Sequence, residues 1–279
     1  MKVGIGLPST IPGATGDETR EWARRAEAAG FSTLGTIDRI VYPNHESLIA
    51  LAFAAAVTER IGLLTSILLA PLRTNTALLA KQAAAIDVLS GGRLTLGLAV
   101  GGREDDYDVS GVDYHQRGAI FERQLEELRR IWNGDDIGPD PGPGRPQVIV
   151  GGMADAVFRR AARQDGWMMG GGPPERFPDA VAKLEAEWRA AGREGAPRKM
   201  ALGYYGLGDG AEDQIRGYIT HYYAYLGDYA EQMAAGVPSD ARAVKERVTS
   251  FEQAGCDEFV LFPTSSDPAQ VDLLAEAVL

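Results

Sequence analysis

Three glycine-rich stretches carry the clearest chemical signal in this chain of 279 residues, and each one follows or includes an apolar run. They are GLAVGGREDD at 97–106, VIVGG at 148–152 and WMMGGG at 167–172. Glycine at the carboxyl end of a strand lets the backbone approach a ligand closely. One such end alone is typical of a tight turn, whereas three in succession favour a flat cofactor that carries a phosphate.

The stretch VIVGGMADAVFRRAARQDGW, residues 148–167, places two glycines between an apolar run and a helix-like repeat. That layout suits a phosphate. It lacks the third glycine of G-x-G-x-x-G, and it follows a strand in the middle of the chain. The first strand offers only GIGLPST, with two glycines and then a proline. A Rossmann dinucleotide site is therefore disfavoured.

Other catalytic chemistries have little support. The histidines form no H-x-H or H-E-x-x-H pattern, so we expect no metal; a barrel hydrolase would need one at His45 or His115. The lysines lie in helices or at a strand start, which disfavours a Schiff base, and no G-x-S-x-G elbow is present. The residues considered are His45, His115, His221, Lys81, Lys183, Lys199 and Lys245.

Eight short apolar runs must position the glycine-rich ends. They are KVGIGL, STLGTI, IGLLTSILLA, RLTLGLAV, QVIVG, GWMMG, KMALGYY and DEFVLF. Helical patterns separate them; in GAIFERQLEELRRIW the residues Phe121, Leu125 and Leu128 recur on one helix face. Strands that alternate with helices pair in parallel, and eight such units predict an α/β fold, the (β/α)8 TIM barrel, with its active site at the carboxyl ends of the strands.

We expect a single domain over residues 1–279 with two departures from the barrel pattern. The segment NGDDIGPDPGPGRP at 133–146 is too rich in glycine and proline for a regular element and predicts a loop. A helical insertion is expected at about 210–240. Its five tyrosines between 218 and 229 favour an aromatic face that packs on the barrel or on a second subunit, rather than one that contacts substrate.

Composition narrows the partners and the compartment. With 45% hydrophobic residues and a net charge of −11, the chain is typical of a soluble protein and disfavours nucleic acid or an anionic membrane as partner. The one cysteine, Cys256, excludes an intramolecular disulfide and is expected to be a small buried hydrophobe. No segment approaches the ~20 apolar residues of a membrane span, so we expect a cytoplasmic protein.

Several stretches resemble the bacterial luciferase-like family of flavin-dependent oxidoreductases, whose members use FMN or the deazaflavin F420. They are GFSTLGTID, the run from ERIGLLTSILLAPLRT through LSGGRLTLGLAVGGREDD to YHQRG, the stretch IVGGMADAVFRRAARQDGW, and AGCDEFVLF. The resemblance implies a (β/α)8 barrel with insertions and a flavin that lies across the carboxyl ends of the strands.

The resemblance also implies which residues hold the flavin. The diglycine and the two residues after it would meet the phosphate, and the glycines at 170 and 171 would border it. A non-prolyl cis peptide bond is expected behind the isoalloxazine ring, at Leu69–Ala70. The loop that begins at Val100 either reaches the ribityl or phosphate end of the cofactor, together with Glu104 and Asp105, or is simply solvated. The implied residues are Leu69, Ala70, Val100, Gly101, Gly102, Arg103, Gly151, Gly152, Met153, Ala154, Gly170 and Gly171.

The catalytic residues stay open, with Asp38, Arg39 and His115 as candidates. Relatives that use F420 often carry Asp-His where this chain has Asp38-Arg39, and some sugar-phosphate dehydrogenases of the group have a glutamate where it has Gly102. Those acid–base roles do not transfer. Arg39 is expected to hold an anionic ring or substrate, or to form a surface salt bridge. His115 is expected at a helix entry rather than as a proton donor.

The leading hypothesis is a luciferase-like monooxygenase in which reduced FMN and oxygen act on a small apolar organic substrate. A separate flavin reductase using NAD(P)H would be its partner, and we expect a homodimer. The alternatives are hydride transfer from F420 and a non-catalytic flavin-binding homologue. Loss of the Asp-His pair favours FMN.

Overall fold

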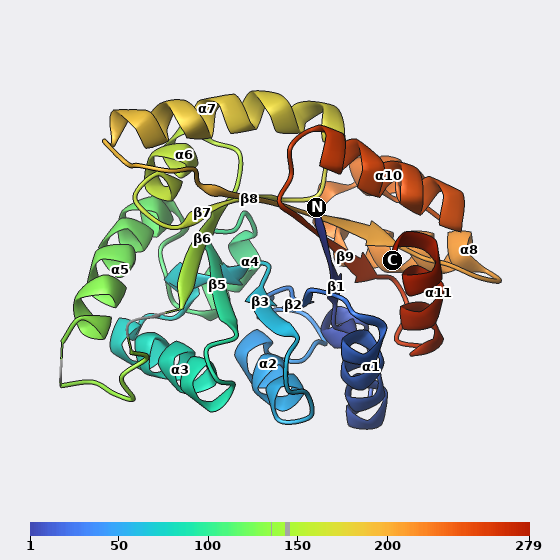
Figure 1. The fold of residues 1–279 in the computed structure, drawn as a ribbon, viewed down its shortest axis with the longest axis horizontal. Helices are drawn as coiled ribbons and strands as arrows, with labels where there is room; N and C mark the ends of the chain where they lie inside the picture. The colour runs from blue at the N-terminus through green and yellow to red at the C-terminus, as the bar shows by residue number, and fades with distance from the viewer. Residues whose placement is uncertain (135, 143–145) are drawn as a thin grey trace.

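The computed structural model describes residues 1–134, 136–142 and 146–279. In these residues the strands form one parallel sheet that closes on itself, because β3 pairs with both β2 and β5 (Figure 1). The strands are β1 Lys2–Gly6, β2 Thr33–Thr36, β3 Gly62–Thr65, β4 Leu68–Leu69, β5 Leu94–Ala99, β6 Gln147–Gly151, β7 Gly166–Met169, β8 Arg198–Tyr205 and β9 Glu258–Pro263.

The third wall of the barrel is built from two strands. β3 ends at Thr65, and the wall resumes as the two-residue β4, whose Leu68 and Leu69 pair with Leu98 and Ala99 of β5. The predicted strand IGLLTSILLA is therefore interrupted at Ser66 and Ile67. The other predicted strands are present as single elements, and the (β/α)8 barrel is confirmed.

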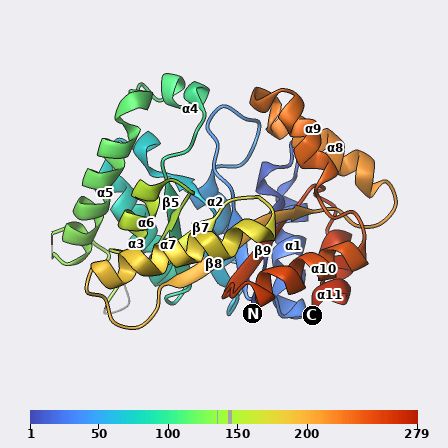
Figure 2. The same ribbon diagram turned by 90° about the horizontal axis from the view of Figure 1, so that it is seen from above.

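Helices surround the sheet in a ring, and α4, α8 and α9 lie at the end of the barrel away from both termini (Figures 1 and 2). Helix α1 begins at a capping box of Thr15 and Glu18 and ends at Gly30, whose φ of 94° suits glycine. The helices are α1 Gly16–Ala29, α2 Ser47–Ala55, α3 Thr76–Leu89, α4 Glu104–Val109, α5 Arg117–Trp132, α6 Asp155–Ala161, α7 Phe177–Ala190, α8 Ala211–Tyr222, α9 Asp228–Ala235, α10 Ala241–Gln253 and α11 Ala269–Val278, with short 3₁₀ turns η1 Pro8–Thr10, η2 Ala70–Leu72, η3 Tyr114–Gln116, η4 Pro174–Arg176 and η5 Ala224–Leu226.

Alternate residues of the strands contribute to two hydrophobic cores. One set packs outward against the helices, and includes the predicted face of α5, Phe121, Leu125 and Leu128. The other set, with Leu64 of β3 and Met168 of β7, fills the barrel interior. Side chains of α8 join the interior set, so the insertion forms a roof over part of the barrel.

The helical insertion comprises α8, η5 and α9. Tyr218 and Tyr222 are buried, and the Tyr218 hydroxyl lies 2.7 Å from Thr10 Oγ1 after β1. The Tyr223 hydroxyl lies 2.9 Å from that of Tyr204 on β8. Packing of the aromatic face on the barrel is confirmed for these residues, whereas Tyr229 stays exposed.

The amino end of the barrel is tied together by polar side chains that all have partners. The buried Glu258 carboxylate accepts hydrogen bonds from Ser32 Oγ and Thr33 Oγ1, each at 2.6 Å, and pairs with Arg198. Arg198 also donates to Gln147 Oε1 at 2.9 Å, which connects β8, β9, β2 and β6. This end therefore serves the fold, because charge and hydrogen bonds are satisfied within the protein.

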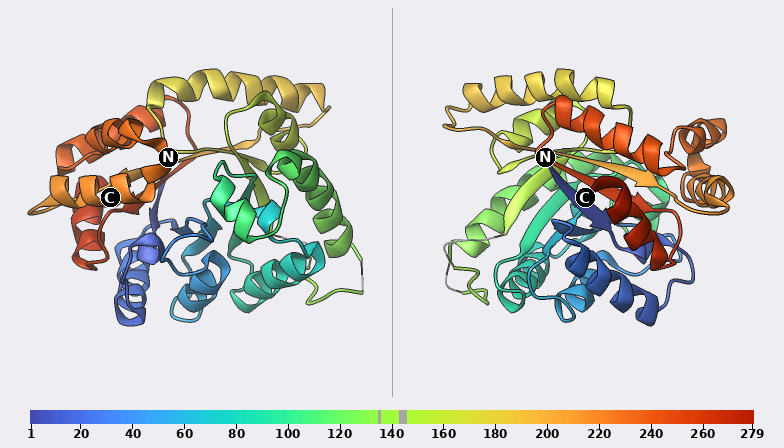
Figure 3. Two further views of the ribbon diagram at one scale, coloured as in Figure 1. Left: turned by 180° about the vertical axis from the view of Figure 1, so that it is seen from behind. Right: turned by 45° about the vertical axis from the view of Figure 1, so that its right-hand side comes forward.

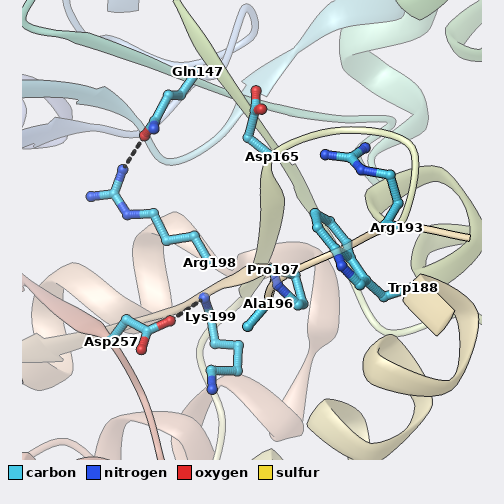
Figure 4. Close-up of a pocket in the computed structure, with 9 residues that line it drawn as sticks. All are labelled: Gln147, Asp165, Trp188, Arg193, Ala196, Pro197, Arg198, Lys199 and Asp257. Carbon is cyan, nitrogen blue, oxygen red and sulfur yellow. Dashed lines mark hydrogen bonds between the residues drawn. The ribbon is translucent and has the colours of Figure 1, made fainter.

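A hollow of about 460 Å³ opens at the same amino end (Figure 4). Arg198 and Lys199 lie on its lining together with Asp165 and Asp257, and Arg193 stacks on the Trp188 ring at 4.2 Å. Asp165 and Asp257 accept backbone hydrogen bonds from Val148 and Lys199. The hollow lies at the opposite end of the strands from the glycine-rich stretches.

Three smaller expectations concern Cys256, the loop and the membrane. Cys256 is buried, and burial raises the pKa of its thiol to about 12. The described residues of the predicted loop at 133–146 contain no helix or strand, and Asp135 and 143–145 lie outside the described residues. None of the described helices is long and apolar enough to cross a membrane.

Candidate active site

The floor at the carboxyl end of the barrel is shaped by Ile67. Its side chain lies over two glycines of neighbouring strands: a Cβ on Gly151 would lie 1.9 Å from Ile67 Cδ1, and one on Gly97 would lie 3.1 Å from Ile67 Cγ1. The Gly97 position would also clash with the Thr65 carbonyl oxygen at 2.1 Å. Glycine is therefore required there, so that the chain between β3 and β4 can lean across the strand ends.

The non-prolyl cis peptide bond is at Ser66–Ile67, so the predicted position at Leu69–Ala70 was wrong. That prediction assumed one continuous strand through Ala70. In the structure the chain leaves the wall after Thr65, while Leu69 pairs in β4 and Ala70 begins η2. Ala70 is completely buried, and its carbonyl accepts a hydrogen bond from Gln124, whereas Leu69 is half-buried.

The loop from β5 to α4 begins close to Leu69. Gly101 has a φ of 72°, and a Cβ there would lie 2.8 Å from Leu69 Cδ2. Val100 is half-buried and Gly102 is exposed. This loop and the chain around Ile67 thus form one side of the opening, where α4 lies in front of the strands when the barrel is seen from behind (Figure 3, left).

The predicted phosphate loop follows β6. Gly152 has a φ of 125°, a conformation that favours glycine, and its carbonyl accepts a hydrogen bond from Trp167 Nε1 at 2.7 Å. Within the part of the chain that the structure describes, the N–H groups of Met153 and Ala154 donate no hydrogen bond. Ala154 is the N-cap of α6 and offers no side-chain cap. The free donors and the small residues Gly152 and Ala154 fit a phosphate. Gly170 and Gly171 after β7 are exposed beside this end of the barrel.

Three buried hydroxyls at the ends of neighbouring strands lack hydrogen-bond partners among the described residues. They belong to Ser9 after β1, Thr36 at the end of β2 and Ser66 after β3. An unpaired buried hydroxyl costs free energy, so such groups mark places that water or a ligand satisfies. Sequence reasoning missed them, since serine and threonine at strand ends give no distinctive pattern.

Asp38 is an anchor rather than a free acid. Its fully buried carboxylate accepts a hydrogen bond from the Leu69 N–H at 2.9 Å and one from Arg73 Nη2 at 2.8 Å. Arg73 also donates to Glu46 at 2.8 Å. Burial lowers the pKa of Arg73, but the charges and hydrogen bonds of Asp38 and Glu46 together outweigh burial and raise it. Asp38 therefore holds β4 to the chain after β2.

Arg39 forms an ion pair, but a buried one. Its guanidinium lies 2.9 Å from Asp105 Oδ2 and 3.1 Å from Asp106 Oδ2, and its side chain is only 7% exposed. Asp106 in turn accepts hydrogen bonds from the Ile40 and Val41 N–H groups. The salt bridge lies inside the protein rather than at the surface, and it links the chain after β2 to α4.

Arg103 is the N-cap of α4 and is 8% exposed. Its guanidinium carbon lies 4.3 Å from the centre of the Tyr222 ring and 4.5 Å from that of Tyr225. No carboxylate of the described residues lies within 4.0 Å of it. The regular spacing of tyrosines in the insertion was the sequence signal for this cluster, although it did not reveal the arginine.

His115 lies on the surface in η3, just before α5, and its backbone N–H donates to Asp113 Oδ1 at 2.8 Å. Its place at a helix entry agrees with the expected structural role.

Taken together, these features make the carboxyl ends of the strands the candidate ligand site of this (β/α)8 barrel, the end that holds the active site in barrel enzymes. The chain belongs to the luciferase-like monooxygenase family, which it matches over residues 1–271. It is therefore an oxidoreductase, as the sequence resemblance indicated.

Curated relatives are similar over part of the chain. An uncharacterised protein of Mycobacterium tuberculosis is 33% identical over 206 residues, which cover 61% of this chain and 71% of that one. The pyrimidine monooxygenase RutA of Escherichia coli is 29% identical over 200 residues, which cover 65% of this chain and 54% of RutA.

Solved structures share the fold over nearly the whole chain. An F420-dependent secondary alcohol dehydrogenase, solved with an F420–acetone adduct, has a TM-score of 0.81 at 19% identity and covers 100% of this chain and 98% of its own. Monooxygenase RslO1 from Streptomyces bottropensis has a TM-score of 0.79 at 23% identity, with coverage of 99% and 98%.

Proposed function

We propose that this protein is a flavin-dependent monooxygenase that uses reduced FMN and oxygen to oxygenate a small organic substrate. One oxygen atom would enter the substrate and the other would leave as water, with the two electrons supplied by reduced FMN when it is bound. A separate reductase using NAD(P)H would restore the reduced flavin.

The observation that carries the choice of FMN is the state of Arg39. In relatives that use F420, the resemblance places a histidine near the reactive ring at this position. Here Asp105 and Asp106 neutralise Arg39, and Asp38 beside it is bound to Leu69 and Arg73. Neither side chain is free to move a proton at the ring. A chemistry that relies on the flavin and oxygen, with little help from protein acids, suits this arrangement.

The residues around the opening fit the parts of FMN. The N–H groups of Met153 and Ala154 would bind the phosphate, with Gly152 leaving room for it. Ile67 and Leu69 offer half-buried apolar surface for the flat ring. The roof formed by α8 and η5 would keep water from the reacting end of the site.

Titration of the purified protein with FMN and F420 in parallel tests the proposal. We expect FMN to bind at micromolar or lower concentration, followed by quenching of its fluorescence, and F420 to bind more weakly. Tighter binding of F420 would instead support hydride transfer. If neither binds below roughly millimolar concentration, a span of about 4 kcal/mol from micromolar, the proposal is wrong.

Two carboxylate variants locate the phosphate. Gly152→Asp should lose FMN binding through repulsion, but its φ of 125° also strains the fold. Ala154→Asp avoids that problem, because aspartate is a favoured N-cap and should stabilise α6 by about 0.5–2 kcal/mol. We expect Ala154→Asp to weaken FMN at least about tenfold, as one lost charge-assisted contact does, while riboflavin, which lacks the phosphate, binds as before. Ala191→Asp, at an exposed position after α7, is the control. If Gly152→Asp, Ala154→Asp and Ala191→Asp bind FMN with equal affinity, the phosphate site is assigned wrongly.

A further inference from the structure

Arg103 is a buried cation without a counter-ion. Its Nη1 atom is buried and has no hydrogen-bond partner among the described residues. The tyrosine rings around it, those of Tyr222, Tyr223 and Tyr225 at 4.3, 5.4 and 4.5 Å, offer electron-rich faces but no negative charge. A guanidinium has five N–H donors, and those on Nη1 are unused in this arrangement.

Two other buried arginines at this end of the barrel have carboxylate partners. Arg39 has Asp105 and Asp106, and Arg73 has Asp38 and Glu46. A buried charge without a partner is strongly destabilising. Because the two other arginines are paired, we expect the unpaired one to bind a negative charge that comes from outside the protein. The neighbouring acids do not supply the missing charge, because Arg39 engages both Asp105 and Asp106.

We propose that Arg103 binds an anionic oxygen of the substrate, a carboxylate or a phenolate on a flat body that packs against the tyrosine rings. This inference rests on the proposed function and names the substrate class for it. The guanidinium would receive the oxyanion through paired N–H donors. The ring of Tyr225, which is 54% exposed, would contact the flat part of the molecule, since aromatic faces pack on one another.

The position of Arg103 favours the substrate over the cofactor as the source of the anion. Arg103 lies after β5 and meets the insertion that follows β8, while the donors proposed for the FMN phosphate follow β6. Figure 2 shows α4 and the α8–α9 insertion on opposite sides of the barrel opening. An anion at Arg103 would therefore lie where the two sides already meet.

Calorimetric titration with benzoate and with benzamide, its neutral isostere, tests the inference on the whole chain with and without FMN. We expect benzoate to bind with release of heat and benzamide to bind at least about tenfold more weakly, the effect of losing a charge-assisted hydrogen bond. Arg103→Gln should weaken benzoate by a similar factor and leave benzamide unchanged. The affinity of Arg103→Lys for benzoate should fall between those of the wild type and Arg103→Gln, because lysine keeps the charge but not the paired N–H donors of the guanidinium. Thermal unfolding of each variant verifies that it is folded.

The control is Arg193→Gln, which removes another stacked arginine at the amino end. It should leave benzoate binding unchanged; a loss there would place the anion in the hollow of Figure 4 and overturn the inference. Equal binding of benzoate by the wild type and Arg103→Gln would overturn it as well. So would a loss of FMN affinity in Arg103→Gln with riboflavin unaffected, because Arg103 would then hold the cofactor phosphate. Failure of FMN to bind the wild type overturns the proposed function, whereas benzoate titration without FMN still tests Arg103.

Discussion

The two ends of this barrel differ in how completely their buried polar side chains are paired. At the amino end, Glu258 is shared by Ser32, Thr33 and Arg198, and every contact lies within the protein. At the carboxyl end, the hydroxyls of Thr36 and Ser66 and the Nη1 atom of Arg103 have no partner among the described residues. The comparison indicates that one end is built to hold the strands together and the other to receive a ligand.

The largest expected effect lies at the amino end, in Glu258→Ala. Removing one partner of a buried ion pair costs about 3–5 kcal/mol, and here Arg198 and two hydroxyls would lose their acceptor. Urea unfolding should record this loss, while the FMN affinity of the folded protein stays at the wild-type value. A change in FMN affinity as large as the change in stability would show that the two ends are not independent.

A matched pair on one strand tests the comparison most directly. Thr33 and Thr36 lie at the two ends of β2, but only Thr33 donates a hydrogen bond, to Glu258. Thr33→Val should cost about 1–3 kcal/mol, because a buried acceptor loses a donor, whereas Thr36→Val should be neutral or stabilising. Chemical denaturation of both variants measures the difference. If Thr36→Val lowers the free energy of unfolding as much as Thr33→Val does, the Thr36 hydroxyl has a hydrogen-bond partner in solution. The contrast between the two ends of the barrel then fails.

A smaller effect is expected for Glu27→Gln. The Glu27 carboxylate accepts hydrogen bonds from the N–H groups of Glu59, Arg60 and Ile61 at the amino end of β3. Burial raises the pKa of Glu27, but these donors outweigh burial and lower it below 4.5.

Because the folded-state pKa of Glu27 is below that of the unfolded chain, the carboxylate stabilises the fold above pH 4.5, and this contribution is lost as the pH falls through the folded-state pKa. The variant should be about 1 kcal/mol less stable at pH 7, since the side chain is half-buried. Unfolding at a series of pH values should show the gap closing in acid; a constant gap would contradict the assignment.

The smallest effect is expected for His115→Ala. His115 is exposed in η3, so the free energy of unfolding should change by less than about 0.5 kcal/mol. FMN affinity should also be unchanged. A tenfold loss of turnover with FMN affinity intact would return His115 to the list of proton donors.

Much of the fold could be predicted because it depends on local pattern. The alternation of apolar runs and helical repeats gave the barrel, and the amphipathic spacing of Phe121, Leu125 and Leu128 gave the buried face of α5. The resemblance to the luciferase-like family led to the right class of enzyme. The break between β3 and β4 could not be seen, because apolar residues lie on both sides of the short polar pair Thr65–Ser66 in IGLLTSILLA.

The site was harder to predict, since its character depends on contacts between distant segments. Asp38 and Arg39 were recognised as a departure from the family pattern, but their partners are distant in sequence: Arg73 follows η2 and Asp106 lies in α4. The stacking of Arg103 on Tyr222 joins residues more than a hundred positions apart, and no spacing in the sequence indicates it. Only the three-dimensional structure distinguishes Arg39 and Arg73, which pair with carboxylates, from Arg103, which does not.

The chain carries its own reporter of barrel opening. Cys256 is its one cysteine, lies just before β9 and has a thiol pKa raised by burial to about 12. At pH 8 the folded protein should resist thiol-modifying reagents, because both access and the thiolate form are missing. Modification would then proceed only when β9 separates from its neighbours, so its rate measures how often the barrel opens. New cysteines could be introduced on α8 or α9 for labelling without removing the natural one.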